Sequence, residues 1–155
     1  MLETLTFVTA LGAAVMGGVF YAFSTGVMQA LGRLPSTQGA AAMQSVNIAV
    51  INPLFLGLFL GTAALCLGLC VAAPFTWDES GSGWRLAGAL LYLVGSFAVT
   101  MAANVPLNNA LATVDPDSSV GETTWARYLR TWTRWNHLRT VASIAAAACL
   151  LRSLR

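Results

Sequence analysis

The last apolar run of the chain is too short to cross a lipid bilayer on its own. From Val141 to Leu151 there are 11 uncharged, mostly apolar residues, whereas a spanning helix needs about 20. Extending the run back to Trp132 reaches that length and brings Arg139 to membrane depth. A charge there costs roughly 2.5 to 3.5 kcal/mol on insertion scales, so an ionisable residue in such a helix indicates a functional site. Arg139 is therefore the first residue to consider for function.

The composition is typical of a protein that resides in a membrane. Hydrophobic residues make up 57% of the chain and charged residues 9%, and the mean hydropathy is +0.69. An ordinary soluble domain has about 25% charged residues. We expect an all-α integral membrane protein whose 155 residues form a single domain in contact with the lipid bilayer. The net charge of +2 is too small to indicate a nucleic-acid partner.

Four membrane spans are expected, connected in up-and-down order as a four-helix bundle. They cover about residues 5–31, 54–73, 84–103 and 132–151. A short extra helix from Ser36 is predicted before the second span, and a helical extension from Ser118 or Ser119 before the fourth. Pro106 is expected to interrupt or bend the third helix. The first span is predicted to be retained, because no basic residue precedes it as in a cleaved signal.

Such a bundle places the first and third connections at one end, and the second connection with both termini at the other. Most polar and aromatic residues near the spans then fall at the first end. They are Tyr21, Ser24, Asn47, Asn52, Asn104, Asn108, Trp132, Trp135, Asn136, His137 and Arg139. We predict that this group forms a binding site. The opposite end offers charges that we expect to be solvated, namely Asp78, Glu79, Arg85, Arg152 and Arg155.

Helical phase refines the predicted site. Asn136 and Arg139 share a stripe with Trp132, and they should face the same pocket. His137 is about 100° from Asn136 and about 160° from Arg139 around a regular helix, so both ionisable groups cannot point at one spot. Imidazole titrates near neutrality and suits a general base. By its phase, however, His137 flanks the site or lies at the membrane interface.

Several of these features also have a purely structural interpretation. Asn52–Pro53 fits the start of a helix, and the amides around Pro106 fit a helix end whose free carbonyls they satisfy. Arg139 could extend its guanidinium to the lipid headgroups. We expect no metal and no other cofactor, since a single His without an acid in the spans makes no metal site. The three cysteines form no C-x-x-C pair and fit small packing residues.

The predicted pocket has apolar and aromatic walls, neutral amides and one cation. It suits a flat, lipophilic small molecule with a polar oxygen. Arg139 and the amides would stabilise an enolate or phenolate oxygen relative to its neutral form.

The same residues carry a resemblance to a known family. The segment Asn52-Pro53-Leu54, the stretch from Asn104 through Pro106 to Asn108 and the stretch from Trp132 to Arg139 resemble the anthrone oxygenase-like membrane proteins, long carried as a domain of unknown function. The resemblance covers nearly the whole chain, including the segment from Phe20 to Ser24. It implies the four-span plan and, from some fungal members, oxidation of an anthrone to an anthraquinone without metal or flavin.

If this activity carries over, the substrate is deprotonated and its anion reacts with O2, with Arg139, Asn136 and Asn104 or Asn108 holding the oxyanion. His137, Tyr21 or a water would be the base. Two alternatives stand beside the oxygenase: a non-catalytic binder or transporter of a lipophilic molecule, and a structural membrane subunit. We expect a bacterial plasma membrane, with the site end facing the cytoplasm because four arginines outside the spans lie there, against three at the other end.

Overall fold

The computed structural model describes every residue from Met1 to Arg155 and is all-helical, with no strand. Five continuous helices follow one another along the chain. The first, Leu2–Leu31, comprises α1 (Leu2–Ala22), the π-helical segment η1 (Phe23–Val27) and α2 (Met28–Leu31); it is followed by α3 (Ser36–Ala49). The next, Pro53–Phe75, comprises α4 (Pro53–Ala72) and a short 3-10 turn. The fourth, Ser82–Ala112, comprises α5 (Ser82–Tyr92), the π-helical segments η3 (Leu93–Ala98) and η4 (Thr100–Asn104), and α6 (Val105–Ala112), and the last is α7 (Ser119–Arg152). The all-helical class is confirmed, and three of these helices, Leu2–Leu31, Pro53–Phe75 and Ser82–Ala112, are long and apolar enough to cross a membrane.

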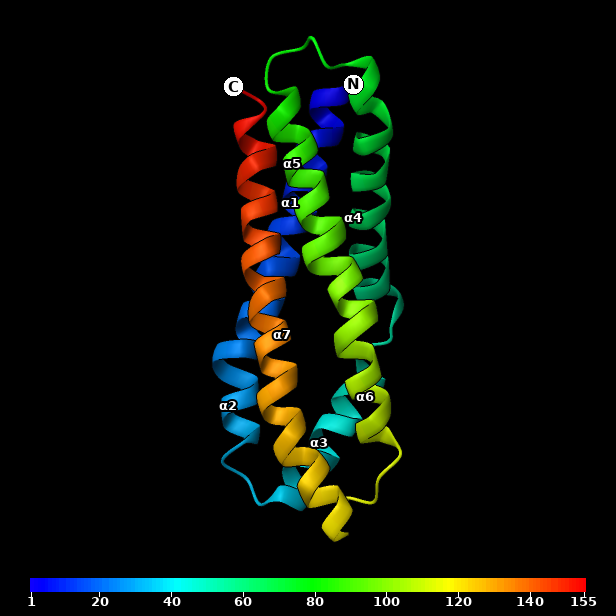
Figure 1. The fold of residues 1–155 in the computed structure, drawn as a ribbon, viewed down its shortest axis with the longest axis vertical. Helices are drawn as coiled ribbons and strands as arrows, with labels where there is room; N and C mark the ends of the chain where they lie inside the picture. Colours follow the sequence, from blue (N-terminus) through cyan, green and yellow to red (C-terminus); the bar gives the residue numbers. More distant parts are fainter.

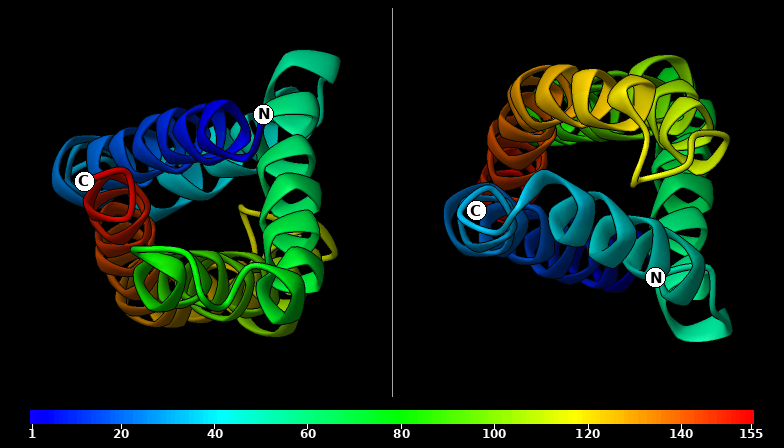
Figure 2. Two further views of the ribbon diagram at one scale, coloured as in Figure 1. Left: turned by 90° about the horizontal axis from the view of Figure 1, so that it is seen from above. Right: turned by 90° about the horizontal axis from the view of Figure 1, so that it is seen from below.

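The long helices lie side by side along the long axis of the molecule (Figure 1, Figure 2). α1 packs against α4 and α7, and α5 packs against the same two helices on the other side. Both termini and the α4–α5 turn lie at one end, at the top of Figure 1, which we call the terminal end. The α2–α3 and α6–α7 connections lie at the other, the α3 end, where α3 packs against α6 and α7.

Side-chain caps fix two helix starts close to where the sequence places them. The Asn52 side chain accepts hydrogen bonds from the backbone N–H groups of Leu54 and Phe55, with proline in the first turn of α4. Ser118 caps α7 by accepting from the Gly121 N–H. These caps satisfy N–H groups that have no partner within the helix.

Pro106 does not interrupt the third long helix, so of the two outcomes expected there, an interruption or a bend, the interruption is wrong. The helix continues to Ala112, with proline in the first turn of α6 directly after the π-helical segment η4. Proline lacks an N–H and clashes with the carbonyl four residues earlier. A wider π turn absorbs both effects, because its hydrogen bonds run between residues five apart.

Two apolar cores follow each other along the axis. The core toward the terminal end is built from α1, α4, α5 and α7 and comprises Ala10, Ala13, Met16, Phe20, Phe59, Ala63, Cys66, Leu69, Ala89, Tyr92, Ala146, Ala147 and Leu150. The core at the α3 end comprises Met28, Ala40, Met43, Leu111, Trp125, Tyr128 and Trp132. α7 contributes to both, and between its two contributions it buries the polar residues Asn136, Arg139, Thr140 and Ser143.

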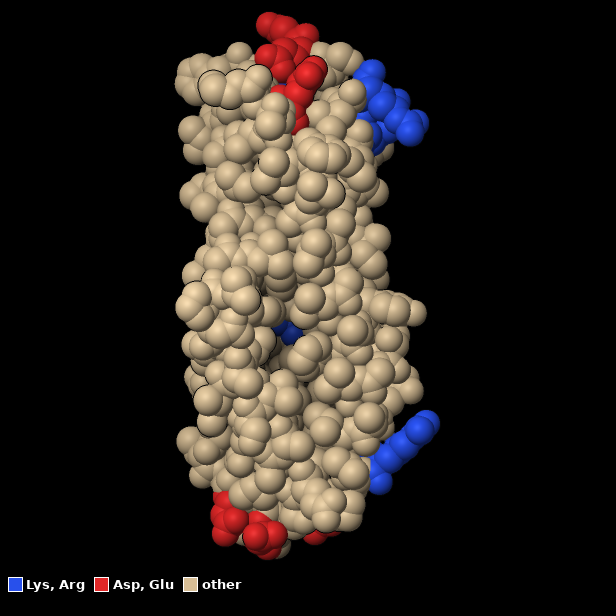
Figure 3. Space-filling view, turned by 180° about the vertical axis from the view of Figure 1, so that it is seen from behind, with Lys and Arg blue, Asp and Glu red and all other residues tan.

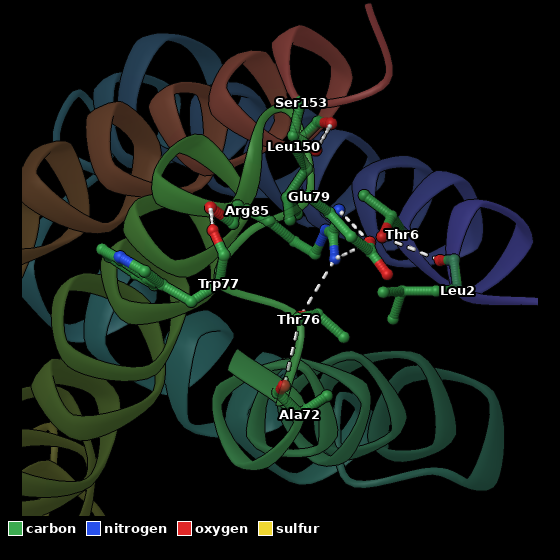
Figure 4. Close-up of polar contacts among 10 residues, drawn as sticks. Leu2, Thr6, Ala72, Thr76, Trp77, Glu79, Arg85, Leu150 and Ser153 are labelled. Atoms are coloured by element: carbon green, nitrogen blue, oxygen red, sulfur yellow. Dashed lines mark hydrogen bonds and ion pairs between the residues drawn. The ribbon is translucent and has the colours of Figure 1, made fainter. Parts of the chain in front are cut away.

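Arg85 is not a solvated charge, contrary to expectation. Figure 4 shows it reaching into the α4–α5 turn, where its Nη1 and Nη2 each lie 3.2 Å from Oε2 of Glu79 and its Nη1 lies 3.4 Å from Oγ1 of Thr76. The residue is only 7% exposed. It is buried because α5 starts three residues before it and the turn folds Glu79 back over the guanidinium. Arg85 therefore holds the turn together.

Candidate functional site

Arg139 lies on α7 in the polar layer between the two cores and is 5% exposed. Its Nη2 donates to Oδ1 of Asn136 at 2.6 Å, and its Nη1 donates to Oγ1 of Thr100 at 3.1 Å. Asn136 precedes it by one helical turn, and Thr100 comes from η4 on the neighbouring helix. The guanidinium is thus fixed inside the molecule and does not reach the headgroups.

Two aromatic rings enclose the guanidinium. The Cζ of Arg139 lies 4.3 Å from the centroid of the Phe20 ring and 5.1 Å from that of the Trp132 ring. Both distances are within the range of cation–π attraction. Phe20 belongs to the core toward the terminal end and Trp132 to the core at the α3 end. The charge therefore lies where the two cores meet.

No carboxylate compensates the charge of Arg139. The single ion pair of the molecule joins Arg85 to Glu79 at the terminal end. The Nε of Arg139 is buried and has no hydrogen-bond partner. Burying a charge without a counter-ion is expensive, and neutral amides and hydroxyls repay only part of that cost. A buried cation in this condition is a candidate binding site for an anion.

Asn136 connects Arg139 to α1. Its Nδ2 donates to the backbone oxygen of Phe20 and to Oγ of Ser24, both at 2.7 Å, while its Oδ1 accepts from Arg139. Asn136 is fully buried and Ser24 is 3% exposed. Since both hydrogens of Nδ2 are used and Oδ1 accepts from Arg139, the residue orients the guanidinium and has no donor left for a ligand.

Amides and aromatic hydroxyls form a second network on the α3 side of Arg139. Oδ1 of Asn108 accepts from the Tyr128 hydroxyl and from Nε1 of Trp132, both at 2.8 Å. Nδ2 of Asn47 lies 3.5 Å from the Tyr128 hydroxyl. Burial raises the pKa of the Tyr128 phenol, so this residue is neutral and acts as a donor. The network fixes the Trp132 ring against the guanidinium.

The π-helical segments carry several buried polar residues, of which Thr100 contacts Arg139 and Ser24 contacts Asn136. Ser24 lies in η1, Ser96 in η3, and Thr100 and Asn104 in η4. Single π turns inside α-helices are rare and occur often at functional sites. Two of the three segments thus contribute a side chain to the hydrogen bonds around Arg139 and Asn136.

Four buried polar atoms in this part of the molecule have no hydrogen-bond partner. They are Arg139 Nε, Asn104 Oδ1, Ser96 Oγ and Ser143 Oγ. Nδ2 of Asn104 is engaged, since it donates to the backbone oxygen of Trp132 at 3.3 Å. Buried polar groups without a partner are uncommon in folded proteins. These atoms remain without a protein partner in the structure.

A hollow leads from the side of the molecule toward a buried basic group. Figure 3 shows charged side chains toward the two ends and an uncharged belt between them, with a hollow in the belt and a basic side chain at its floor. Arg85 and Arg139 are the two buried arginines, and Arg85 lies at the terminal end. Arg139 lies between the two cores, away from both ends of the molecule.

A sequence profile of the family described as anthrone oxygenase matches residues 54–149. The match covers more than half of the chain. The protein belongs to the anthrone oxygenase family. Comparison with curated proteins and with solved structures gives no match.

The matched part of this anthrone oxygenase family member contains most of the candidate site. Arg139, Asn136 and Thr100 fall within residues 54–149, as do Asn104 and Asn108, whereas Phe20 and Ser24 precede the match. No group of three His, Cys, Asp or Glu side chains is placed to hold a metal ion. The side chains at the site are a guanidinium, amides, hydroxyls and aromatic rings.

The structure brings some of the predicted site residues together and separates others. Those that surround Arg139 or its supporting network are Ser24, Asn47, Asn104, Asn108, Trp132 and Asn136. Three others lie on the outer surface: Tyr21, which is 56% exposed, Trp135, which is 41% exposed, and His137, which is also exposed. The Asn52 side chain is used locally: its Oδ1 caps α4, and its Nδ2 donates a hydrogen bond to the Ala49 carbonyl.

Tyr21 lies outside because the inward stripe of the first helix runs through Phe20, Ser24 and Met28. The π turn over η1 keeps residues four apart on this inward face of the helix. Tyr21, one position after Phe20, falls at the edge of that face. Trp135 and His137 are on the outward face of α7, as the helical phase of His137 predicts. An exposed Trp at the end of a span is typical of an interfacial anchor.

The sequence analysis missed Phe20, Thr100 and Tyr128 as site residues. Phe20 and Tyr128 resemble ordinary core residues when read from the sequence alone. Thr100 had a visible signal, since Ser96, Thr100 and Asn104 repeat every four residues on an otherwise apolar helix. A polar stripe of this kind faces protein or a cavity, because polar groups are costly in contact with lipid.

Proposed function

We propose that this anthrone oxygenase family member is a membrane-embedded oxygenase that binds an aromatic, lipophilic substrate through an anionic oxygen at Arg139. The buried guanidinium without a counter-ion carries the proposal. A ligand that supplies the missing negative charge removes the cost of burying the cation. The family membership supports an oxygenase, and the rings of Phe20 and Trp132 suit a flat aromatic molecule.

The proposal includes α7 as a fourth membrane span. Two exposed arginines, Arg134 and Arg152, are 18 positions apart on this helix, and Arg139 between them is buried. At about 1.5 Å per residue this separation is about 27 Å, close to the thickness of about 30 Å of a hydrocarbon core. Arg139 would then lie about 8 Å inside the bilayer from the level of Arg134. The remaining positions between the two exposed arginines are uncharged.

The proposed role of Arg139 is to stabilise an enolate or phenolate. An anthrone carries a methylene group whose deprotonation places negative charge on the oxygen of its ketone group. A fixed cation beside that oxygen favours the anion over the neutral ketone, and low surrounding polarity strengthens the effect. The free Nε of Arg139 and the free Oδ1 of Asn104 would contact the oxygen and a neighbouring hydroxyl.

The anion then reduces O2. The carbon that lost its proton bonds to one oxygen atom and gives a hydroperoxide once the peroxide oxygen takes a proton. Loss of water from the hydroperoxide breaks the O–O bond and the remaining C–H bond and leaves a carbonyl. One methylene and one O2 thus yield one ketone and one water. The protein supplies the anion-stabilising charge, and a water or the substrate's own hydroxyl carries the proton, because His137 and Tyr21 lie outside.

Turnover of an anthrone by the purified protein tests the proposal. We expect quinone absorbance to rise with matching O2 uptake, and Arg139→Gln to lower kcat/KM at least about 100-fold, as for loss of one oxyanion-stabilising donor. Arg134→Gln is the matched control, since it removes an exposed arginine from the same helix. Equal rates for wild type and both variants would exclude Arg139 from the reaction.

Spectra recorded without O2 separate an oxygenase from a non-catalytic binder. Wild type should bind the anthrone as its anion, seen by the anion's absorbance, and convert it when O2 is admitted. Arg139→Gln should bind the neutral form. An anion that stays unchanged after O2 is admitted would identify a binding protein and overturn the oxygenase proposal.

A further inference from the structure

A groove of about 410 Å³ lies on the surface between α2 and α7 at the α3 end. Its lining combines apolar, polar and basic residues, namely Ser24, Met28, Gln29, Gly32, Arg33, Leu129, Arg130 and Thr133. Gly32 faces Leu129, so the turn after α2 packs directly on α7. This groove adjoins the Arg139 network at Ser24, whose Oγ accepts from Asn136, but Arg139 itself is buried deeper in the molecule and does not line the groove.

Two uncompensated cations define the character of the groove. Arg33 and Arg130 are both exposed, and neither forms an ion pair, since the single pair of the molecule is Arg85 with Glu79. Gln29 and Thr133 add an amide and a hydroxyl from the facing helices. Two guanidinium groups with neighbouring neutral donors suit a phosphate, which accepts several hydrogen bonds at once.

The depth of the groove identifies the source of that phosphate. Arg130 lies four residues beyond Arg134, hence about 6 Å farther from the middle of the proposed span. The headgroup layer begins at this level, outside a hydrocarbon core of about 30 Å. Met28 and Leu129 continue the groove with apolar surface, which suits the glycerol and upper acyl region of a lipid.

We propose that this groove binds the phosphodiester headgroup of an anionic phospholipid, with Arg33 and Arg130 holding the phosphate and Gln29 and Thr133 completing its hydrogen bonds. The site positions the α2–α3 turn against α7 at the membrane surface. It rests on the proposed span of α7, which sets the depth of the groove, but not on the oxygenase chemistry, because none of these four side chains contacts Arg139.

Native mass spectrometry of the full-length protein in detergent tests this site. The probes are phosphatidylglycerol, phosphatidylcholine with the same acyl chains, and inorganic phosphate as competitor. We expect wild type to retain phosphatidylglycerol in preference to phosphatidylcholine, with no displacement by millimolar phosphate. The double variant Arg33→Gln/Arg130→Gln should bind phosphatidylglycerol about 30-fold more weakly, from the contribution of two arginines near an anionic surface.

The control variant is Arg152→Gln/Arg155→Gln, which removes the same charge from exposed positions at the terminal end. It should bind phosphatidylglycerol like wild type. Equal loss in both double variants, or equal retention of the two lipids by wild type, would reduce the groove to general surface charge. Displacement by inorganic phosphate would assign it to a soluble anion and overturn the lipid proposal.

Discussion

At the scale of single residues, the two buried arginines of this chain show opposite solutions to one problem. Arg85 is compensated by Glu79 and closes a turn. Arg139 has two neutral acceptors and two aromatic rings, but no carboxylate. A charge kept in a costly environment without a structural partner is typical of a residue retained for function at the expense of stability.

This contrast predicts opposite effects on stability. Arg139→Met removes an uncompensated charge and fills its volume, so the free energy of unfolding should stay equal or rise by up to about 3 kcal/mol, while anthrone turnover is lost. Glu79→Ala leaves Arg85 buried without its partner and should lower that free energy by about 1 to 2 kcal/mol, a modest value because Glu79 is 55% exposed. Thermal unfolding in detergent measures both. If Arg139→Met destabilises the protein as much as Glu79→Ala does, the arginine is structural.

At the scale of the helices, caps could be predicted from the sequence and π turns could not. Asn52-Pro53 and Ser118 are local signals, because a capping side chain reaches only its own first turn. The π turns over η1, η3 and η4 depend on packing against α7, and no residue type specifies them. The phase of Arg139 and His137 on the regular helix α7 was predicted correctly, whereas Tyr21, just before η1, was predicted in the site and lies on the outer surface.

The cap of α4 gives a prediction at this scale. Asn52→Ala frees the N–H groups of Leu54 and Phe55 and should lower the free energy of unfolding by about 0.5 to 2 kcal/mol. Asn52→Ser should recover most of the loss. Anthrone turnover at low temperature should match wild type in both variants, since the Asn52 side chain is committed to the cap. Lost turnover with unchanged thermal stability would instead return Asn52 to the binding site.

At the scale of the whole molecule, the sequence already indicated which polar residues lie at the same end. Up-and-down order alone brings the first and third connections together, and Asn47, Asn108 and Asn136 do lie in one half of the structure. The sequence could not show how deep each of them lies, because depth depends on how the helices are offset along the axis. The two cores and the polar layer between them became visible only in the structure.

The same arrangement predicts the membrane topology. Three helices have the length and composition of spans, and with three alone the two termini would lie on opposite sides of the membrane. Crossing by α7 makes the number even, so reporter fusions at the N-terminus and the C-terminus should report the same side. A reporter inserted at Asp115–Asp117, in the α6–α7 connection, should report the other side, which we expect to be the cytoplasm because Arg33, Arg127, Arg130 and Arg134 lie at that end. Termini on opposite sides would place α7 and Arg139 outside the bilayer, and the substrate would then reach the arginine from water.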